Sequence, residues 1–172
     1  LANKHPRVNI LEPGPGVGGH CIAVDPWFIV SNSPKEAKLI KMARKVNDSK
    51  PNWVVNKLKL AITDYLLNFP EKTIENVTIA CFGLTFKPDI DDLRGSPAMQ
   101  IVEEISNFHK GRILAVEPNI THISSNNKIE LVSFSEAEND ADIALLLVDH
   151  AEFKGHKKLD IDFIIDTKGI WI

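Results

Sequence analysis

The second half of the chain alternates between short apolar runs and amphipathic segments. Residues 77–84 form a continuous apolar run rich in β-forming side chains, the pattern of a parallel strand buried on both faces. Ser96 and Pro97 then begin a helical pattern that continues through Phe108, with Gly111 as its expected stop. Further strands are expected over residues 112–116, 128–133, 143–148 and 163–166, and a short helix over 135–139. This alternation predicts an α/β fold with a Rossmann-like, doubly wound parallel sheet.

A long helical pattern precedes the sheet, over residues 33–69. Apolar residues recur there at helical spacing, at Ala37, Ile40, Ala43 and Val46 and again at Val54, Leu58, Ala61, Ile62 and Tyr65. Ser33 with Glu36 three residues later has the pattern of a capping box, which predicts the start of the helix. Pro51 lacks an amide hydrogen and clashes with the preceding turn, so we expect a break or kink near Asp48 and Ser49. The fold class is therefore a long central helix followed by the sheet.

Composition changes this picture little. The chain is 44% hydrophobic and 25% charged, with a net charge of −3. No apolar run approaches the length of a membrane span, and no signal peptide precedes the first glycines. The two cysteines are far apart without a C-x-x-C partner, and the histidines show no ligand spacing, which argues against a zinc site and fits a reducing cytoplasm. Eight basic residues between 35 and 59 are spread along the helical pattern, so we expect a solvated helix face rather than a nucleic-acid surface.

Residues 13–28 carry the strongest candidate chemistry. Four glycines precede Cys21, at positions Gly14, Gly16, Gly18 and Gly19. Asp25 and Pro26 follow, and this pair predicts a helix start with Asp25 as the N-cap. Cys21 would then lie at a loop-to-helix junction, beside backbone that carries no side chains. A thiol there could attack a bound substrate, with the carboxylate of Asp25 one helical turn away.

Two other interpretations of the glycine loop are open. Gly14, Gly16 and Gly19 match the dinucleotide pattern G-x-G-x-x-G, with residues 7–11 as the preceding strand. That pattern also needs a helix opening at the third glycine and an acidic residue about 20 positions on after a second strand, whereas a helical pattern follows here. The other interpretation is a Gly/Pro turn with a buried structural cysteine, because free cysteines are commonly buried. Spacing alone does not separate the reactive cysteine from the structural one.

The loop over residues 86–94 is the second candidate. It mixes two cations, Lys87 and Arg94, with three carboxylates and leads into a helix N-terminus, which suits a phosphate but is also typical of a charged surface loop. It follows a strand, as Lys168 does, and ligands of doubly wound sheets bind at the carboxyl ends of the strands. We expect Cys81 to fill the core. Asp149 and His150 also follow a strand, and we interpret them as loop polarity rather than an acid/base pair.

Both loops resemble signatures of the UDP-glucose/UDP-N-acetylmannosamine dehydrogenase family of nucleotide-sugar 6-dehydrogenases. Residues 16–28, Gly-Val-Gly-Gly-His-Cys-Ile-Ala-Val-Asp-Pro-Trp-Phe, are similar to its catalytic-cysteine segment. Residues 82–97, Phe-Gly-Leu-Thr-Phe-Lys-Pro-Asp-Ile-Asp-Asp-Leu-Arg-Gly-Ser-Pro, are similar to its second signature. The resemblance extends over essentially all 172 residues. Its details look most like the UDP-N-acetyl-D-mannosamine branch: His20 before the cysteine, Asp-Pro-Trp-Phe after it, and a closing Asp-Thr-Lys-Gly-Ile-Trp.

The resemblance implies a domain organisation and an activity. Residues 1–70 would hold the catalytic-cysteine loop and central dimerisation helices, and residues 71–172 a UDP-sugar-binding Rossmann-like domain, with an N-terminal NAD-binding domain outside this chain. The implied protein is a cytoplasmic homodimer, paired through the central helix, that binds neither nucleic acid nor membrane. Its implied reaction oxidises the C6 alcohol of the UDP-sugar to a carboxylate in two hydride transfers to NAD, through a cysteine thiohemiacetal and thioester. The alternatives are the same chemistry on UDP-glucose or UDP-N-acetylglucosamine, and a non-catalytic UDP-sugar-binding dimerisation fragment.

The resemblance also assigns roles to residues. Cys21 and Asp25 would be catalytic, and Arg94 would contact the cofactor. The substrate-binding set would be Gly18, Gly19, His20, Phe86, Lys87, Lys168 and Arg7. Many relatives have an arginine at the position of Lys168, and a lysine cannot form the same two-pronged contact. Arg7 would reach the sugar nucleotide of the partner subunit, although its spacing to the cysteine is shorter here than in the family.

Overall fold

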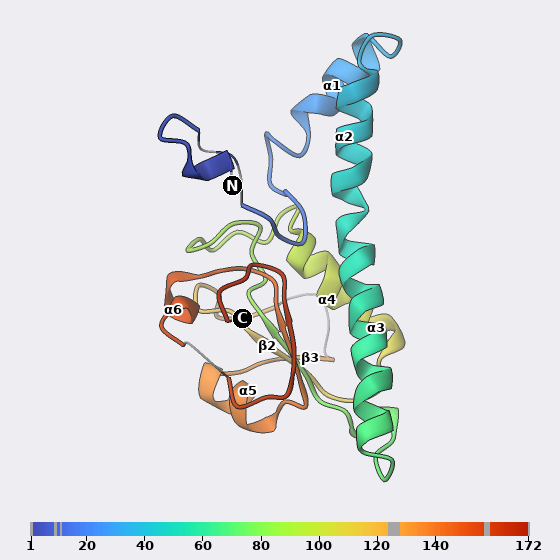
Figure 1. Cartoon of the computed structure of the whole chain (residues 1–172), viewed down its shortest axis with the longest axis vertical. Helices are drawn as coiled ribbons and strands as arrows, with labels where there is room; N and C mark the ends of the chain where they lie inside the picture. The colour runs from blue at the N-terminus through green and yellow to red at the C-terminus, as the bar shows by residue number, and fades with distance from the viewer. Residues whose placement is uncertain (1, 9, 11, 124–127, 157–158, 172) are drawn as a thin grey trace.

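The computed structural model describes residues 2–8, 10, 12–123, 128–156 and 159–171. Its architecture confirms the predicted α/β class: a long bent helix, followed by a five-stranded parallel sheet with helices between the strands (Figure 1). In chain order the elements are η1 (Ala2–Lys4), α1 (Asp25–Asn32), α2 (Lys38–Asp48), α3 (Lys50–Asn68), η2 (Ile74–Asn76), β1 (Ile79–Phe82), α4 (Pro97–Phe108), β2 (Ile113–Val116), β3 (Ile129–Leu131), α5 (Phe134–Asp140), β4 (Ile143–Leu146), α6 (Ala151–Lys154) and β5 (Phe163–Asp166).

The sheet has the strand order β3-β2-β1-β4-β5, and every pair of neighbours is parallel. Strand β1 lies at the centre, paired with β2 on one side and β4 on the other, and all its residues are buried. The strand order reverses direction between β1 and β4, so this is the topological switch point of a doubly wound sheet. All carboxyl ends lie along one edge, which brings the loops after β1, β2, β4 and β5 together.

Helices cover both faces of the sheet. On one face, the buried stripe of α3 packs with α4 against β1, β2 and β4; its members are Val54, Val55, Leu58, Ile62 and Tyr65. The other face carries α5, α6 and the C-terminal Trp171. Burying each such aliphatic side chain contributes about 1.5–3 kcal/mol to folding. None of the helices in the described part of the chain is both long and apolar enough to cross a bilayer.

The start of α1 differs from the prediction by one position. Val24, not Asp25, occupies the N-cap, and no side chain caps this helix. The carbonyl of Cys21 accepts hydrogen bonds from the amides of Val24 at 3.0 Å and Asp25 at 2.8 Å. The chain has therefore already turned before Asp25, so its amide is satisfied by the backbone of Cys21 and its carboxylate sits in the first helical turn.

The predicted capping box at Ser33 is wrong, whereas the predicted break at Pro51 is confirmed. The amide of Ser33 donates to Ile29 and closes α1, while its carbonyl accepts from Ala37, so the chain turns here and α2 begins only at Lys38. Helix α2 ends at Asp48, and Ser49 keeps helical angles (φ −83°, ψ −12°). Pro51 lies in the first turn of α3, where its missing amide hydrogen costs nothing. The two helices thus form one bent rod.

The helix after β1 starts and ends at the predicted residues, although Gly111 does not provide its stop. The hydroxyl of Ser96 accepts a hydrogen bond from the amide of Met99 at 3.2 Å, which caps α4. The helix ends at Phe108, before Gly111, because His109 adopts extended angles. Short helix α6 was not predicted from the sequence. The amide of Ala151, its first residue, donates a hydrogen bond to Oδ1 of Asp89, which lies 62 positions earlier in the chain.

Candidate functional site

A pocket of about 360 Å³ lies between the glycine loop and the carboxyl edge of the sheet. Gly18, Phe86, Lys87 and Lys168 all line it, and so does Ile22, the residue after Cys21. Larger hollows of about 480 and 590 Å³ occur beside α3 and at the amino end of the sheet. We take the smaller pocket as the site because it adjoins the switch point, where doubly wound sheets bind ligands, and because it gathers residues from both candidate loops.

The glycines allow the two candidate loops to interlock. The amide of Gly19 donates to the carbonyl of Gly95 at 3.3 Å. A Cβ atom on Gly18 would lie 2.2 Å from the Gly95 carbonyl oxygen, and one on Gly19 would lie 2.7 Å from the ring of Phe86. Gly19 also has φ +87°, a conformation that side chains rarely tolerate. Close packing between the loops therefore requires glycine at both positions.

Asn47, on α2, holds the glycine loop from the other side. Its Oδ1 accepts a hydrogen bond from the amide of Val17 at 2.8 Å, and its Nδ2 donates to the Val17 carbonyl at 3.2 Å. One side chain thus satisfies both backbone groups of Val17. Sequence reasoning missed this contact, because the two residues are 30 positions apart and nothing in either segment signals the pairing.

Asp92 joins three of the predicted site residues. Its Oδ2 lies 3.0 Å from Nε2 of His20, and both carboxylate oxygens accept hydrogen bonds from the guanidinium of Arg94. Its backbone carbonyl accepts the amide of Phe86 at 3.2 Å, and the rings of His20 and Phe86 meet edge to face. The guanidinium of Arg94, with a further hydrogen bond from His20, holds the pKa of Asp92 well below its usual range. The side chain of Asp92 therefore links the loop that carries Cys21 to the loop that carries Arg94.

Cys21 is exposed at the turn that leads into α1. The interpretation as a buried structural cysteine therefore does not describe it. Asp25 is exposed one turn further on, its amide bonded to the Cys21 carbonyl. By contrast, Cys81 is fully buried in β1, where burial raises the pKa of its thiol to about 12. It fills the core, as predicted.

Lys168 is fixed at the wall of the pocket by Asp149. Its Nζ lies 3.1 Å from Oδ1 of Asp149, while Lys154 lies 3.1 Å from Oδ2. The contact with Lys168 is an ion pair rather than a well-directed hydrogen bond, because Oδ1 has no partner with hydrogen-bond geometry among the described residues. Burial alone would raise the pKa of Asp149, but the two ammonium groups outweigh it and lower the pKa. Asp149 thus stays ionised and orients Lys168.

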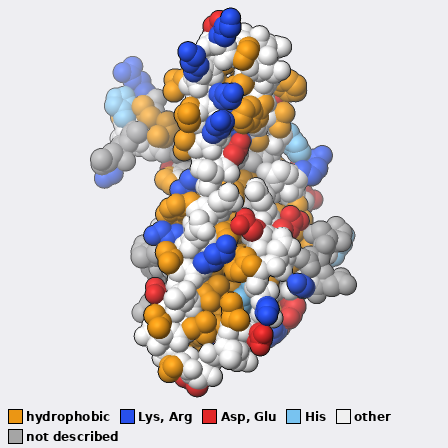
Figure 2. Space-filling model, turned by 90° about the vertical axis from the view of Figure 1, so that its right-hand side faces the viewer, with side chains coloured by type: hydrophobic (Ala, Val, Ile, Leu, Met, Phe, Trp, Pro, Cys, Tyr) orange, Lys and Arg blue, Asp and Glu red, His pale blue; other side chains and the backbone are white. Residues whose placement is uncertain are grey.

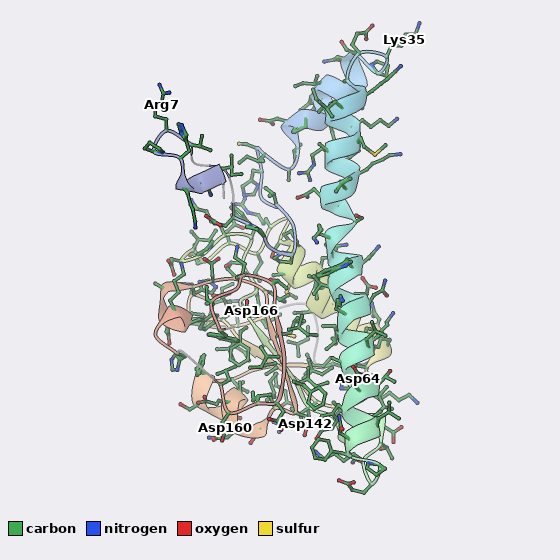
Figure 3. The ribbon with its side chains drawn as sticks, in the orientation of Figure 1. Arg7, Lys35, Asp64, Asp142, Asp160 and Asp166 are labelled. Carbon is green, nitrogen blue, oxygen red and sulfur yellow. The ribbon has the colours of Figure 1, made fainter. Side chains whose placement is uncertain are left out.

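One of the predictions about the surrounding residues needs correction, and one stays open. His150 is not loop polarity, because its side chain is fully buried and its Nε2 lies 3.0 Å from Oε2 of Glu117. Arg7 is exposed on the N-terminal segment and points away from the rest of the chain (Figure 3), so it does not line the pocket of its own chain, and its reach to a partner subunit stays a prediction.

The glycine loop does not have the geometry of a dinucleotide fingerprint. Helix α1 begins at Asp25, not at the third glycine, Gly19. The strand considered over residues 7–11 is absent at residues 7, 8 and 10, while 9 and 11 lie outside the described residues. Within the described ranges, no three histidine, cysteine, aspartate or glutamate side chains are grouped to hold a metal ion.

The sequence matches two domain profiles of a single family. Residues 80–172, more than half of the chain, match the UDP binding domain of the UDP-glucose/GDP-mannose dehydrogenase family. Residues 1–49 match the central domain of the same family. The first match contains the loop after β1 and Lys168, and the second contains the glycine loop and Cys21.

Individual relatives show the same likeness along the whole chain. The chain is 52% identical over 179 residues to the UDP-N-acetyl-D-mannosamine dehydrogenase of Salmonella typhimurium and 54% identical over 175 residues to that of Yersinia pestis. Each alignment covers 99% of this chain but only 41% of the relative. The chain therefore spans less than half the length of these curated relatives.

Solved structures agree with the sequence relatives. The UDP-N-acetyl-mannosamine dehydrogenase Cap5O from S. aureus matches with a TM-score of 0.71 and 40% identity, over 98% of this chain and 38% of that one. The UDP-D-ManNAc dehydrogenase from Pyrococcus horikoshii matches with a TM-score of 0.73 and 32% identity, over 98% and 39% of the two chains.

Proposed function

The chain belongs to the UDP-glucose/GDP-mannose dehydrogenase family, and on this basis we propose that it is the cysteine-bearing, UDP-sugar-binding part of an NAD-dependent UDP-N-acetyl-D-mannosamine 6-dehydrogenase. The observation that carries the proposal is the pocket that gathers Gly18, Phe86, Lys87 and Lys168 beside the Cys21 loop. Residues 1–70 supply the cysteine loop and the helical rod, and residues 71–172 the domain that binds the UDP moiety.

In this proposal, two lysines bind the diphosphate of the ligand. Lys87 is exposed at the pocket and has no ion pair among the described residues, so its charge is available to a ligand. Lys168 is already paired with Asp149, so it acts as an oriented donor more than as a net positive charge. A lysine ammonium binds phosphate as a point charge, without the fork of an arginine. Phe86, packed under Gly19 and His20, supplies an apolar wall.

Cys21 explains how one site completes two oxidations. After the first oxidation, the thiolate adds to the aldehyde carbon at C6, and the carbonyl oxygen takes up a proton to give a thiohemiacetal. Loss of a hydride and a proton converts this to a thioester. Water then attacks the thioester carbon, the C–S bond breaks, and the thiolate is released with the carboxylate product. We assign Asp25, exposed one turn from Cys21, to accept the proton of the attacking water.

NAD supplies the hydride acceptor for both oxidations when bound. The described residues fit it only in part, because the glycine loop opens no helix at its third glycine. Arg94 is the residue of this chain that we assign to the cofactor. Its side chain is 77% exposed, and Asp92 holds its Nε and Nη2, which leaves Nη1 for a phosphate oxygen.

The helical rod offers a face for a second copy, on the side away from the apolar stripe that was expected from the sequence over residues 54–65. The stripe from Val54 to Tyr65 is used within the chain, packed on α4 and the sheet. On its outer side the rod exposes large apolar residues seven positions apart: Leu39, Val46, Trp53, Leu60 and Leu67, each 49–82% exposed. Figure 2, which views the molecule from the side of the rod, shows apolar patches along its length. A sustained heptad spacing is the signature of helix-on-helix packing, and we propose that it pairs with its own copy.

A substrate panel on the complete gene product tests the proposal. UDP-N-acetyl-D-mannosamine should give two NADH per sugar and the best kcat/KM, ahead of UDP-glucose, UDP-N-acetylglucosamine and GDP-mannose. A clear preference for one of the other sugars would change the proposed substrate but leave the proposed reaction unchanged. Binding of UDP-sugars with no NADH from any of them would favour the non-catalytic alternative.

A further inference from the structure

Glu117 and His150 form a buried hydrogen-bonded pair at the switch point of the sheet. Glu117 follows β2, His150 follows β4, and neither side chain has any exposed surface. Nδ1 of His150 accepts the backbone amide of Asp89 at 3.0 Å, so it carries no proton. The ring proton therefore sits on Nε2, which donates to the Glu117 carboxylate at 3.0 Å. The pair is thus a carboxylate and a neutral imidazole of fixed tautomer.

The carboxylate of Glu117 binds the backbone amides of the loop after β1, where the anion of a ligand could otherwise bind. Its Oε2 accepts the amides of Leu84 at 2.7 Å and Thr85 at 3.2 Å, the backbone donors that follow β1. In sheets of this type, amides at that turn commonly bind the phosphate of a ligand. Here they are already satisfied, so the anion of a ligand has to be met outside the turn, at Lys87 and Lys168.

Glu117 and His150 each fix one end of the segment that faces the pocket, which runs from Thr85 to Asp89. Glu117 holds the amide of Thr85, whose hydroxyl donates to the Lys87 carbonyl at 2.9 Å. His150 holds the amide of Asp89, which has φ +61°, an uncommon conformation for a residue other than glycine. Phe86 and Lys87 lie between these two anchors. Their geometry is therefore set by groups that never reach the pocket.

We propose that Glu117 and His150 are positioning residues for nucleotide-sugar binding, which act by fixing the loop that presents Phe86 and Lys87. This inference rests on the proposed function. It extends the site by two residues that touch no ligand, and it predicts that their loss weakens binding of UDP while leaving the chemistry of bound substrate largely intact.

Calorimetric titration of the complete gene product with UDP tests the inference. His150→Leu removes the ring hydrogen bonds to Glu117 and to the Asp89 amide, and it should weaken UDP binding at least tenfold, with KM for the UDP-sugar raised similarly and kcat changed less than threefold. His150→Gln keeps one donor and one acceptor and should recover most of the affinity. His122→Leu, at an exposed histidine, is the matched control and should bind as the wild type does.

The outcomes separate this inference from the function on which it rests. Failure of the wild type to bind UDP would overturn both. Wild-type affinity in a folded His150→Leu variant would overturn the positioning role alone, as would equal losses in kcat and kcat/KM. If His150→Leu does not fold, ring ¹⁵N spectra of the wild type decide. UDP should shift the His150 signals and not those of His122, and unchanged His150 signals would contradict the proposal.

Discussion

The two cysteines of the chain lie in opposite environments. Cys21 is exposed beside the pocket, whereas Cys81 is buried at the centre of β1 with its pKa raised to about 12 by burial. Reactivity of a thiol follows its exposure and its thiolate fraction. Cys81 therefore serves as an internal control when the reactivity of Cys21 is measured.

We predict that iodoacetamide under native conditions labels one thiol per chain, that of Cys21. Mass spectrometry of the digested protein should place the label there, and in Cys21→Ser no label should appear until denaturant exposes Cys81. UDP-sugar should slow the labelling, because Ile22, beside Cys21, lines the pocket. Equal native labelling of both cysteines would contradict the described burial.

At this scale, the sequence pointed to residues whose chemistry is visible in a local motif. Gly18, Phe86, Lys87 and Lys168 do meet in one pocket. It did not point to Asn47, Glu117 or the role of His150, because these act through contacts with backbone groups 30 to 61 positions away. No short pattern encodes such a pairing, since it depends on which loops the sheet brings to one edge.

At the scale of elements, a charged cluster fastens the end of α3 to the sheet. The Tyr65 hydroxyl donates to Asp142, and Nζ of Lys72 lies 2.6 Å from both partners. The other oxygen of Asp142 accepts the amide of Thr78 at 2.8 Å, just before β1. Burial alone would raise the pKa of Asp142, but the hydrogen bonds from Lys72 and Tyr65 outweigh it and lower the pKa.

This cluster predicts a defined dependence of stability on pH. An acid whose pKa is lower when folded stabilises above its unfolded pKa, about 3.9 for aspartate, and loses that stabilisation as the pH falls through its folded pKa. Asp142→Asn should therefore lower the free energy of unfolding by about 1–3 kcal/mol at pH 7, and the difference from wild type should shrink below pH ~4. Urea unfolding at several pH values measures it.

Asp140→Asn is the matched control for that experiment. Asp140 pairs with Arg112 at the surface, where both side chains are more than 40% exposed. Such pairs contribute only about 0–1 kcal/mol. A loss in Asp140→Asn as large as that in Asp142→Asn, or a difference between Asp142→Asn and wild type that does not shrink in acid, would contradict the assigned role of the cluster.

The helices and strands with the strongest periodicity were predicted well, and the starts of two helices were not. The run over 163–166 became β5 with the same bounds, and the kink at Pro51 follows from its missing amide. The errors fall at Ser33 and Asp25, where backbone hydrogen bonds from neighbouring turns replaced the expected side-chain caps. Residues that cap helices also occur in turns, so the sequence alone does not decide whether a helix begins at such a residue.

The exposed face of the rod predicts an oligomeric state. Wild-type chain should be a dimer by light scattering at micromolar concentration, and Leu60→Glu should shift it to monomer, because a charge would be buried among apolar side chains. Asn139→Glu, at an exposed position on α5, should leave the dimer intact. A monomeric wild type, or a Leu60→Glu variant that remains dimeric, would remove this face as the interface.

At the scale of the whole molecule, the pocket lies between the glycine loop and the loops that follow β1 and β5. The glycine loop is tied to the rod through Asn47 and to the sheet domain through Gly95 and Asp92. Cys21, the proposed nucleophile, is thereby held near the loop that presents Phe86 and Lys87. Under the proposed function, one bound UDP-sugar contacts Lys87, Lys168 and Cys21.

The central claim is that Cys21 carries the second oxidation as a covalent intermediate. The most direct measurement is the rate of uronic acid formation by the complete gene product with Cys21→Ser, beside Cys81→Ala as a control. We predict that Cys21→Ser completes at most the first oxidation and lowers uronate formation by at least about 10³-fold, since a serine hydroxyl without an adjacent base is a poor nucleophile. Cys81→Ala should retain the second oxidation. Uronate formation by Cys21→Ser at the wild-type rate would contradict the covalent mechanism.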